Sequence, residues 1–309
     1  MKRTKSIFIT LVKLCVLVVI IFSMIFVFQT YKNTNRVALH EKQKDVLRVA
    51  TYNVHYIRAG VQTGPWSVSD WDRRKEPMSL AIQKIDADII GFQEMESFSR
   101  DDADNKNLTR DYLLQKNPRY SAGAIGDTQD FPSTQPIFYN TEKFKLLDQG
   151  WFFFSDTPDS IYSRTFNGSY PAFASWIQIQ NNETDNVLRV VNIHTDFASS
   201  ENRTKSIELV ASRVRPWIQN NETVLVMGDF NARLGSSLHK IIEEEGLVFS
   251  PIRSATYHFN KGLNLFGAID HVAFSKELEI VSEPVVLQEK FAGEWPTDHY
   301  PVVVDFKVR

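Results

Sequence analysis

The chain has 309 residues and 43% of them are hydrophobic, which is enough for one large core. Six of its 35 basic residues lie in the first 36 positions, which hold no acid, so 29 basic residues face 37 acidic ones beyond them. An acidic domain binds nucleic acid poorly unless cations bridge it to phosphate, so composition argues against binding through general basic charge. The single cysteine, Cys15, excludes an intramolecular disulfide.

The first 31 residues combine a basic head with an apolar segment. Residues 7–28 are almost wholly apolar, which is long enough to cross a bilayer, and Lys13 lies near enough to one end to snorkel. No small-residue cleavage site follows the segment. We therefore predict an uncleaved transmembrane signal anchor over residues 1–31. The alternatives are a cleaved signal peptide and a buried helix of a soluble protein.

The charge of the head predicts the orientation of the anchor. Basic residues beside a membrane span stay in the cytoplasm, so the rest of the chain is expected outside it, in the periplasm or the extracellular space. Residues 32–45 are polar and are predicted to form a linker. Residues 46–309 form the predicted catalytic domain.

Short apolar runs, ended by polar or Gly/Pro signals, recur through this domain. They predict strands over residues 47–52, 89–92, 137–139, 144–153, 172–180, 187–193, 223–228, 268–274, 281–287 and 301–306. Helical periodicity predicts helices over residues 71–85, 200–219 and 238–245. Many strands with few helices between them indicate a sheet sandwich flanked by helices, and the length favours one domain.

Polar residues cluster where the predicted strands end. An Asp-His pair can handle a proton or a metal ion. A carboxylate two residues before a carboxamide can polarise a nucleophile and contact phosphate. The clusters are Tyr52-Asn53, Gln93-Glu94, residues 192–196 with His194, residues 228–231 with Asp229 and Asn231, residues 269–271 with Asp270, and residues 297–299 with Asp298 and His299.

Each cluster alone has a structural explanation. Asn53 and residues 228–231 fit turns, His194 fits a hydrogen-bonded structural histidine, and Glu94 fits the acid at a helix N-terminus. The same polar chemistry at five strand ends and in one further strand favours a functional site instead. Carboxylates at strand exits are the oxygen ligands that Mg²⁺ prefers.

In content and order, these clusters resemble the endonuclease/exonuclease/phosphatase superfamily. This group includes deoxyribonuclease I-like nucleases, neutral sphingomyelinases and inositol polyphosphate 5-phosphatases. The resemblance covers residues 46–307, and residues 71–74, Arg203 and residues 256–258 fit a bacterial branch. It implies a four-layered α/β sandwich, in which helices flank two packed, mainly antiparallel sheets, behind the transmembrane helix of a membrane-anchored member.

The resemblance also implies metal ligands. Glu94 would be the main Mg²⁺ carboxylate, with Asn53 beside it, and Mn²⁺ is the alternative metal. Asp298 would be a further carboxylate that binds the metal or orients a histidine.

The implied catalytic residues are His194, Asp229, Asn231, Asp270 and His299. His299 would act as general base or electrostatic partner of the phosphate, backed by Asp270. Asp229 would orient or deprotonate the attacking water. Asn231 and His194 would contact the phosphate.

The chain departs from the family pattern at positions where other members bind phosphate with arginine. Ala172 stands where many members have arginine, and His55 and Glu96 stand where relatives that act on DNA often have arginine. Arginines able to compensate are Arg58, Arg73, Arg74 and Arg164. We take Arg164 as the predicted substrate contact.

We therefore predict a membrane-anchored, Mg²⁺-dependent enzyme that hydrolyses a phosphoester in a small phosphorylated molecule or a lipid head group. The alternative is a nuclease outside the cytoplasm that acts on DNA or RNA. A non-enzymatic surface binding module is a third alternative, against which the intact polar set argues. The expected partners are the substrate and, through the N-terminal helix, a membrane; the sequence shows no sign of an obligate protein partner.

Overall fold

Strands that are apolar on both faces form two sheets packed against each other. The computed structural model describes residues 2–98, 106–168 and 170–309, and side chains from residue 8 onward. The first sheet has the order β13-β15-β1-β3-β6-β5, and β14 also pairs with β15. Its strands are β13 (Leu278–Ile280), β15 (Val302–Val308), β1 (Leu47–Asn53), β3 (Ile89–Gln93), β6 (Ile137–Asn140), β5 (Tyr120–Gly123) and β14 (Val285–Val286).

The second sheet has the order β11-β12-β10-β9-β8-β7. Its strands are β11 (Val248–Phe249), β12 (Asp270–Phe274), β10 (Thr223–Asp229), β9 (Val187–His194), β8 (Phe173–Asn181) and β7 (Phe144–Phe153). A separate pair joins β2 (Ile57–Arg58) to β4 (Ser97–Phe98) in parallel. Within the two large sheets, the pairs β1-β3 and β9-β10 are parallel and the others are antiparallel.

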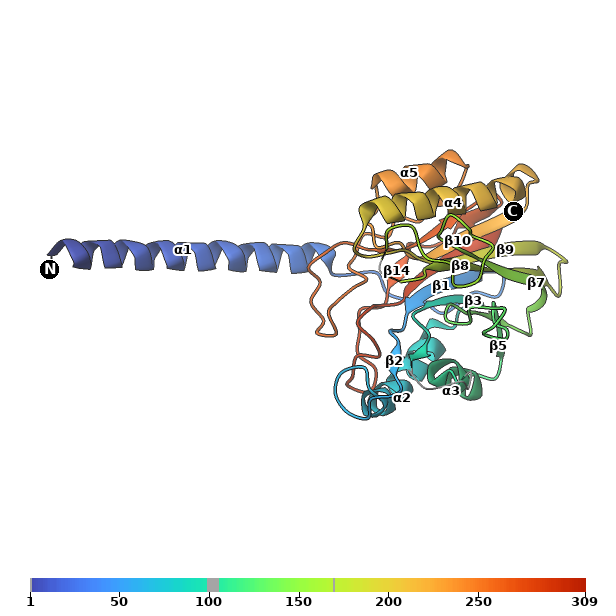
Figure 1. Cartoon of the computed structure of the whole chain (residues 1–309), viewed down its shortest axis with the longest axis horizontal. Coiled ribbons are helices and arrows are strands. Elements are labelled where there is room, and N and C mark those ends of the chain that lie inside the picture. The colour runs from blue at the N-terminus through green and yellow to red at the C-terminus, as the bar shows by residue number, and fades with distance from the viewer. Residues whose placement is uncertain (1, 99–105, 169) are drawn as a thin grey trace.

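Helices cover the outer face of each sheet, which completes four layers (Figure 1). α2 (Val68–Ile85) and α3 (Leu108–Lys116) lie on the first sheet, and α4 (Ser200–Gln219) and α5 (Ser237–Glu244) lie on the second. The pleat sends alternate side chains to opposite layers: Val49 of β1 enters the core between the sheets, and Ala50 packs on the helix side. The predicted α/β sandwich is confirmed.

Two local predictions need correction. The predicted strand over residues 281–287 is wrong, because β13 and β14 are separate. Ile280 pairs with Phe306 and Val285 pairs with Val303, so the residues between them, which include the N–H-lacking Pro284, loop out of the ladder. The sequence prediction also missed α3, a short helix that Asn107 caps by accepting a hydrogen bond from the amide of Arg110.

α1 (Lys2–Asn33) extends away from the domain (Figure 1). Its segment Phe8–Asn33 is long and apolar enough to cross a membrane, and its most apolar stretch is 0% buried. The structure therefore does not place it as a buried helix of the core. The side chains of the basic head, residues 2–5, lie outside the described set.

Residues 34–45, most of the predicted linker, contain no helix or strand but lie against the domain. Val37 and Leu39 pack on the core between the first sheet and its helices. Lys42 forms an ion pair with the buried carboxylate of Asp88, with an N–O distance of 2.9 Å. The segment is bound to the domain surface rather than hanging free.

Candidate active site

The register of the strands gathers the predicted polar residues at one edge of the sandwich. β9 and β10 run parallel and place Asp229 opposite His194. β12 pairs with β10 on its other side and places Asp270 opposite Asp229. In the first sheet, the parallel pair β1-β3 places Asn53 beside Gln93, so that Glu94 follows at the same edge.

His299 reaches this edge from the segment that precedes β15. β15 pairs antiparallel with β1, with Val302 opposite Thr51, so the chain just before Val302 lies beyond the end of β1. An isolated bridge between Tyr257 and His299 holds the segment from the other side. His299 thereby lies between the two sheets.

Gly228 is required for this arrangement. Its φ is +145°, and a Cβ at this position would lie 1.9 Å from the carbonyl oxygen of Ile193. A side chain would push β10 away from β9 and separate Asp229 from His194. This explains the glycine immediately before the aspartate.

Asp229 is the centre of the cluster. One of its carboxylate oxygens, Oδ2, lies 3.7 Å from Nε2 of His194 and 3.8 Å from Nε2 of His299. The same oxygen accepts a hydrogen bond from the Asn53 amide, and the other accepts one from the backbone amide of Asn231 at 2.8 Å. Burial, and then the nearby Asp270, raise the pKa of Asp229 to about 6.

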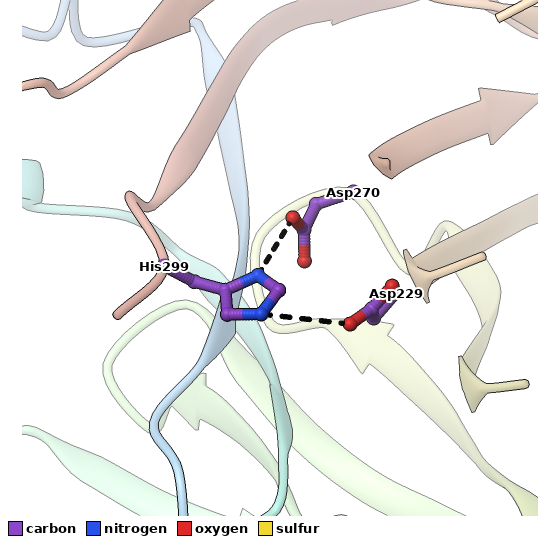
Figure 2. Close-up of side chains that lie close together, drawn as sticks. All are labelled: Asp229, Asp270 and His299. Carbon is purple, nitrogen blue, oxygen red and sulfur yellow. Dashed lines mark hydrogen bonds and ion pairs between the residues drawn. The ribbon is translucent and has the colours of Figure 1, made fainter. Parts of the chain in front are cut away.

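His299 lies between two carboxylates (Figure 2). Its Nδ1 is 3.0 Å from Oδ2 of Asp270, while Nε2 faces Asp229. Burial acts to lower the pKa of His299, but the charge and hydrogen bond of Asp270, together with the charges of Asp229 and Asp298, outweigh it and raise this pKa to about 10. The imidazole is therefore held protonated near neutral pH.

Glu94 lies between the two sheets at the floor of the site. It accepts a hydrogen bond from the Asn53 amide at 3.0 Å, and its carboxylate lies 3.9 Å from His194 and 4.0 Å from His55. Burial acts to raise the pKa of Glu94, but His194, His55 and the Asn53 amide outweigh it and lower this pKa. Its φ of 55° is a left-handed conformation that is uncommon for a non-glycine residue and is often found at functional sites.

Arg74, fully buried on α2, connects this helix by hydrogen bonds to two loops of the site. Its guanidinium donates to the carbonyl of Pro296 at 2.7 Å and to that of Val54 at 3.4 Å, and pairs with Asp70 at 2.9 Å. One side chain thereby positions both the segment after Asn53 and the segment before His299. Because a buried guanidinium without partners is costly, these contacts fix the geometry of the two loops.

These residues open onto a cleft of about 890 Å³. The predicted residues that line it are Glu94, His194, Asp229, Asn231, Asp298 and His299. Asn53 and Asp270 are buried behind them and contact them directly. Arg164, the predicted substrate contact, is exposed and does not line the cleft. Arg58 does line it.

Several lining residues were not part of the predicted site. Tyr170 lies with its ring centroid 6.0 Å from that of His194, and its buried hydroxyl has no hydrogen-bond partner in the described part of the chain. Burial raises the pKa of this phenol, so it stays a donor. Tyr257, Tyr56 and Phe197 add aromatic walls, and all four belong to loops, where no periodic pattern marks a residue in advance.

The side chains present suit a divalent cation in two places. Glu94 and Asp298 offer carboxylate oxygens to the cleft, which are hard ligands of the kind that bind Mg²⁺. Asn53 lies beside Glu94 and donates to it, while its own oxygen accepts from the amide of His55 at 3.1 Å. Asp229, Asp270 and His299 form a second group, whose ligand atoms lie within 4.8 Å of one another. The second group already has its histidine engaged by a carboxylate.

Comparison with known proteins gives one family. The model of the Endonuclease/Exonuclease/phosphatase family matches residues 50–299. A curated relative, the probable CCR4-Not complex 3'-5'-exoribonuclease subunit Ccr4 of Vairimorpha ceranae, is 22% identical over 303 residues. The match covers 84% of this chain and 63% of that protein, so the chain spans less than two thirds of the relative's length.

Solved structures share the fold. A mannosyl-6-phosphatase of Bacteroides thetaiotaomicron has a TM-score of 0.69 at 24% identity, over 84% of this chain and 99% of the other. A family protein from the same organism has a TM-score of 0.70 at 23% identity, over 84% and 97%. The human Nocturnin catalytic domain has a TM-score of 0.60 at 16% identity, over 86% and 95%.

Proposed function

Because the chain belongs to the endonuclease/exonuclease/phosphatase family, whose enzymes are metal-dependent hydrolases, we propose that this site hydrolyses a phosphoester with Mg²⁺ as its metal. The proposed substrate is a small phosphorylated molecule or a lipid head group. The observation that carries the proposal is the meeting of Asp229 with His194 and His299 beside Glu94. A base, two phosphate-facing donors and a metal carboxylate are the parts that phosphoester hydrolysis needs.

We assign the metal to Glu94, Asn53 and Asp298. Nδ1 of His299 already contacts the carboxylate of Asp270, which favours this set over the group of Asp229, Asp270 and His299. When bound, the metal supplies Lewis acidity and neutralises charge on the phosphate oxygens.

The remaining steps belong to the chain's own side chains. Asp229, with a pKa near 6, is ionised at neutral pH and can take the proton of the attacking water as its oxygen bonds to phosphorus. His299, protonated and held by Asp270, donates a hydrogen bond from Nε2 to a non-bridging phosphate oxygen as the ester bond breaks. The leaving oxygen departs as the alcohol after it takes a proton from solvent in the open cleft. Tyr170 and His194 line the same cleft and are the proposed further donors to the phosphate.

The charge of the cleft favours small phosphoesters over nucleic acid. Among the described residues that line it, Arg58 is the only lysine or arginine, against the carboxylates of Glu94, Glu96, Asp229 and Asp298. Nucleic-acid affinity rests largely on many contacts between cations and backbone phosphates. A compact substrate with one or two phosphates needs fewer.

A nuclease is the second candidate, and one observation favours it. Phe197 and Tyr56 are 67% and 38% exposed at the cleft, where bases can stack on them. The curated relative named as an exoribonuclease is consistent with this candidate.

The substrate test uses the full chain in detergent with Mg²⁺, beside the His299→Ala variant. The panel contains p-nitrophenyl phosphate, its bis ester, sugar and inositol phosphates, sphingomyelin, single-stranded RNA and plasmid DNA. Turnover of a small phosphoester or lipid, lost in the variant, supports the proposal. Cleavage of RNA or DNA alone would establish the nuclease instead.

We also propose that α1 is an uncleaved signal anchor that leaves the domain outside the cytoplasm. Its length, apolar composition and exposure support this. The single Cys15 permits a clean test: Cys15→Ser with Lys240→Cys, an exposed position on α5, is labelled with a membrane-impermeant maleimide in intact cells. Labelling before lysis is expected. Labelling only after lysis would show that the domain lies in the cytoplasm.

A further inference from the structure

The end of α1 is joined to the domain by a compact set of hydrogen bonds. The carbonyl of Asn33 accepts from the amide of Ala255 at 2.8 Å and from the side chain of Gln288 at 3.1 Å. The side chain of Asn33 donates to the carbonyl of Asn264 at 3.2 Å, and the Gln288 oxygen accepts from the amide of Asn35 at 2.7 Å. Asn33 is only 4% exposed, so this junction is a packed part of the structure.

A hollow of about 470 Å³ lies beside this junction. Its walls are the end of α1, residues 34–37, residues 251–254 and residues 283–286. Three of the lining residues are cations, namely Lys32, Arg36 and Arg253, and one, Glu283, is a carboxylate.

None of the three cations forms an ion pair with a carboxylate in the described part of the chain. The guanidinium of Arg36 lies 4.1 Å from the ring centroid of Tyr31, which holds it at the hollow. Buried Ile252 and Val286 supply apolar walls. The hollow therefore presents excess positive charge over an apolar base, which suits an anion that carries an apolar body.

The position of the hollow along α1 selects the anion. The apolar segment ends near Phe28, and Tyr31 is 64% exposed at the level where aromatic side chains meet lipid headgroups. With α1 across a membrane, Lys32 and Arg36, which follow Tyr31, and Arg253, which lines the same hollow, are expected at the depth of the lipid phosphates. Cations at this depth attract anionic lipids more strongly than zwitterionic ones.

We propose that this hollow binds the phosphate-bearing headgroup of an anionic phospholipid. The proposal rests on the membrane-spanning role of α1 and is independent of the catalytic proposal. Binding there would stabilise the junction between anchor and domain. It would also order the segment that runs from Ala255 in the junction to Tyr257 in the catalytic cleft.

The test is native mass spectrometry of the full chain, released from detergent micelles that contain equal amounts of phosphatidylglycerol and phosphatidylcholine. The wild type should retain phosphatidylglycerol in preference. The variant Arg36→Gln/Arg253→Gln should lose about fivefold of this preference for each cation removed. The matched control Lys145→Gln/Lys240→Gln removes two exposed cations elsewhere on the domain and should behave as the wild type.

Three results would overturn the proposal. The first is equal retention of both lipids by the wild type. The second is an equal loss of preference in the control, which would mean general surface charge. The third is a measured mass that lacks the first 31 residues, since Tyr31, which lines the hollow and contacts Arg36, would be absent. Thermal unfolding of each variant in detergent should match the wild type, which separates lost binding from lost folding.

Discussion

Nδ1 of His299 lies 3.0 Å from a carboxylate oxygen of Asp270, so the imidazole presents its other nitrogen to the cleft. The second oxygen of Asp270 is buried and has no hydrogen-bond partner in the described residues. Among the described residues, His299 is therefore the hydrogen-bond partner of the Asp270 carboxylate in the cluster. This pair sets both the orientation and the protonation of the histidine.

The first prediction concerns this pair. Asp270→Asn removes the charge that raises the pKa of His299, and we expect kcat to fall by about 10²- to 10³-fold. The alkaline limb of the pH profile should move to lower pH, because a histidine with a lower pKa loses its proton sooner as pH rises. Phosphate release measured from pH 5 to 11 checks both effects.

Asp148→Asn, on the exposed side of β7, is the matched control and should change neither quantity. In the His299→Ala background, Asp270→Asn should cost little further activity, because the two act as a unit. Fully additive losses, or an unshifted alkaline limb, would show that Asp270 does not act through His299.

The second prediction concerns Glu96, a carboxylate that lines the cleft. Burial and then the negative charge of Glu94 raise the pKa of Glu96. The carboxylates of this part of the cleft therefore lie close enough to repel one another. We expect Glu96→Gln to tighten the binding of single-stranded oligonucleotides by about three- to tenfold at low salt. Fluorescence anisotropy with a labelled oligonucleotide measures it.

Glu183→Gln, an exposed change between β8 and β9, is the control for total charge. An equal gain in affinity in both variants would mean that only net charge matters. No gain in Glu96→Gln would mean that this residue does not discriminate against nucleic acid.

The third prediction concerns Arg74. Arg74→Met keeps much of the buried volume but leaves the carbonyl of Pro296 without this donor and removes one of the donors of Asp70. We expect a loss of about 3–5 kcal/mol in the free energy of unfolding. Arg73→Gln, on the half-exposed side of the same helix, should change it by at most about 1 kcal/mol. Urea unfolding followed by tryptophan fluorescence compares them, and similar losses would contradict the positioning role.

The fourth prediction concerns acid stability. Burial, and then the nearby His271, lower the pKa of His239 to about 3, while its unfolded value is near 6.5. Between these values only the unfolded chain binds the proton, so stability falls as pH decreases from about 6.5. The slope is about 1.4 kcal/mol per pH unit for each such histidine. Burial lowers the pKa of His258 and His271 in the same way.

His239→Phe places an apolar ring beside Phe230 and Phe249 and removes this proton. The free energy of unfolding should then depend less steeply on pH between 6 and 4. The decrease in slope should correspond to about one proton fewer taken up on unfolding. An unchanged slope would mean that His239 does not stay neutral in the folded chain.

The sequence alone predicted the sheets and most of the polar site. A strand such as β10 is buried on both faces, so it is a continuous apolar run, and its end is marked by Gly228 and Asp229. Asn53, Glu94, His194 and Asp229 were predicted together because each follows an apolar run and the set resembles a family pattern, and the parallel pairs β1-β3 and β9-β10 bring these strand ends together.

The rest depends on tertiary contacts that leave no local pattern. Tyr170 and Tyr257 reach the cleft from loops, and their places are set by packing against distant residues. Arg58 and Arg164 are both exposed, but of the two only Arg58 lines the cleft. The attachment of the predicted linker to the domain likewise rests on pairs such as Lys42 and Asp88.

The most direct test of the central claim is phosphate release from the best substrate after EDTA treatment, titrated with Mg²⁺, for the wild type and Glu94→Gln. We predict no activity without metal, saturable recovery with Mg²⁺, and a loss of at least about 10²-fold in Glu94→Gln at every concentration. A parallel titration with Mn²⁺ compares the alternative metal. Hydrolysis that persists in EDTA, or full Mg²⁺-dependent activity in a folded Glu94→Gln chain, would contradict the account.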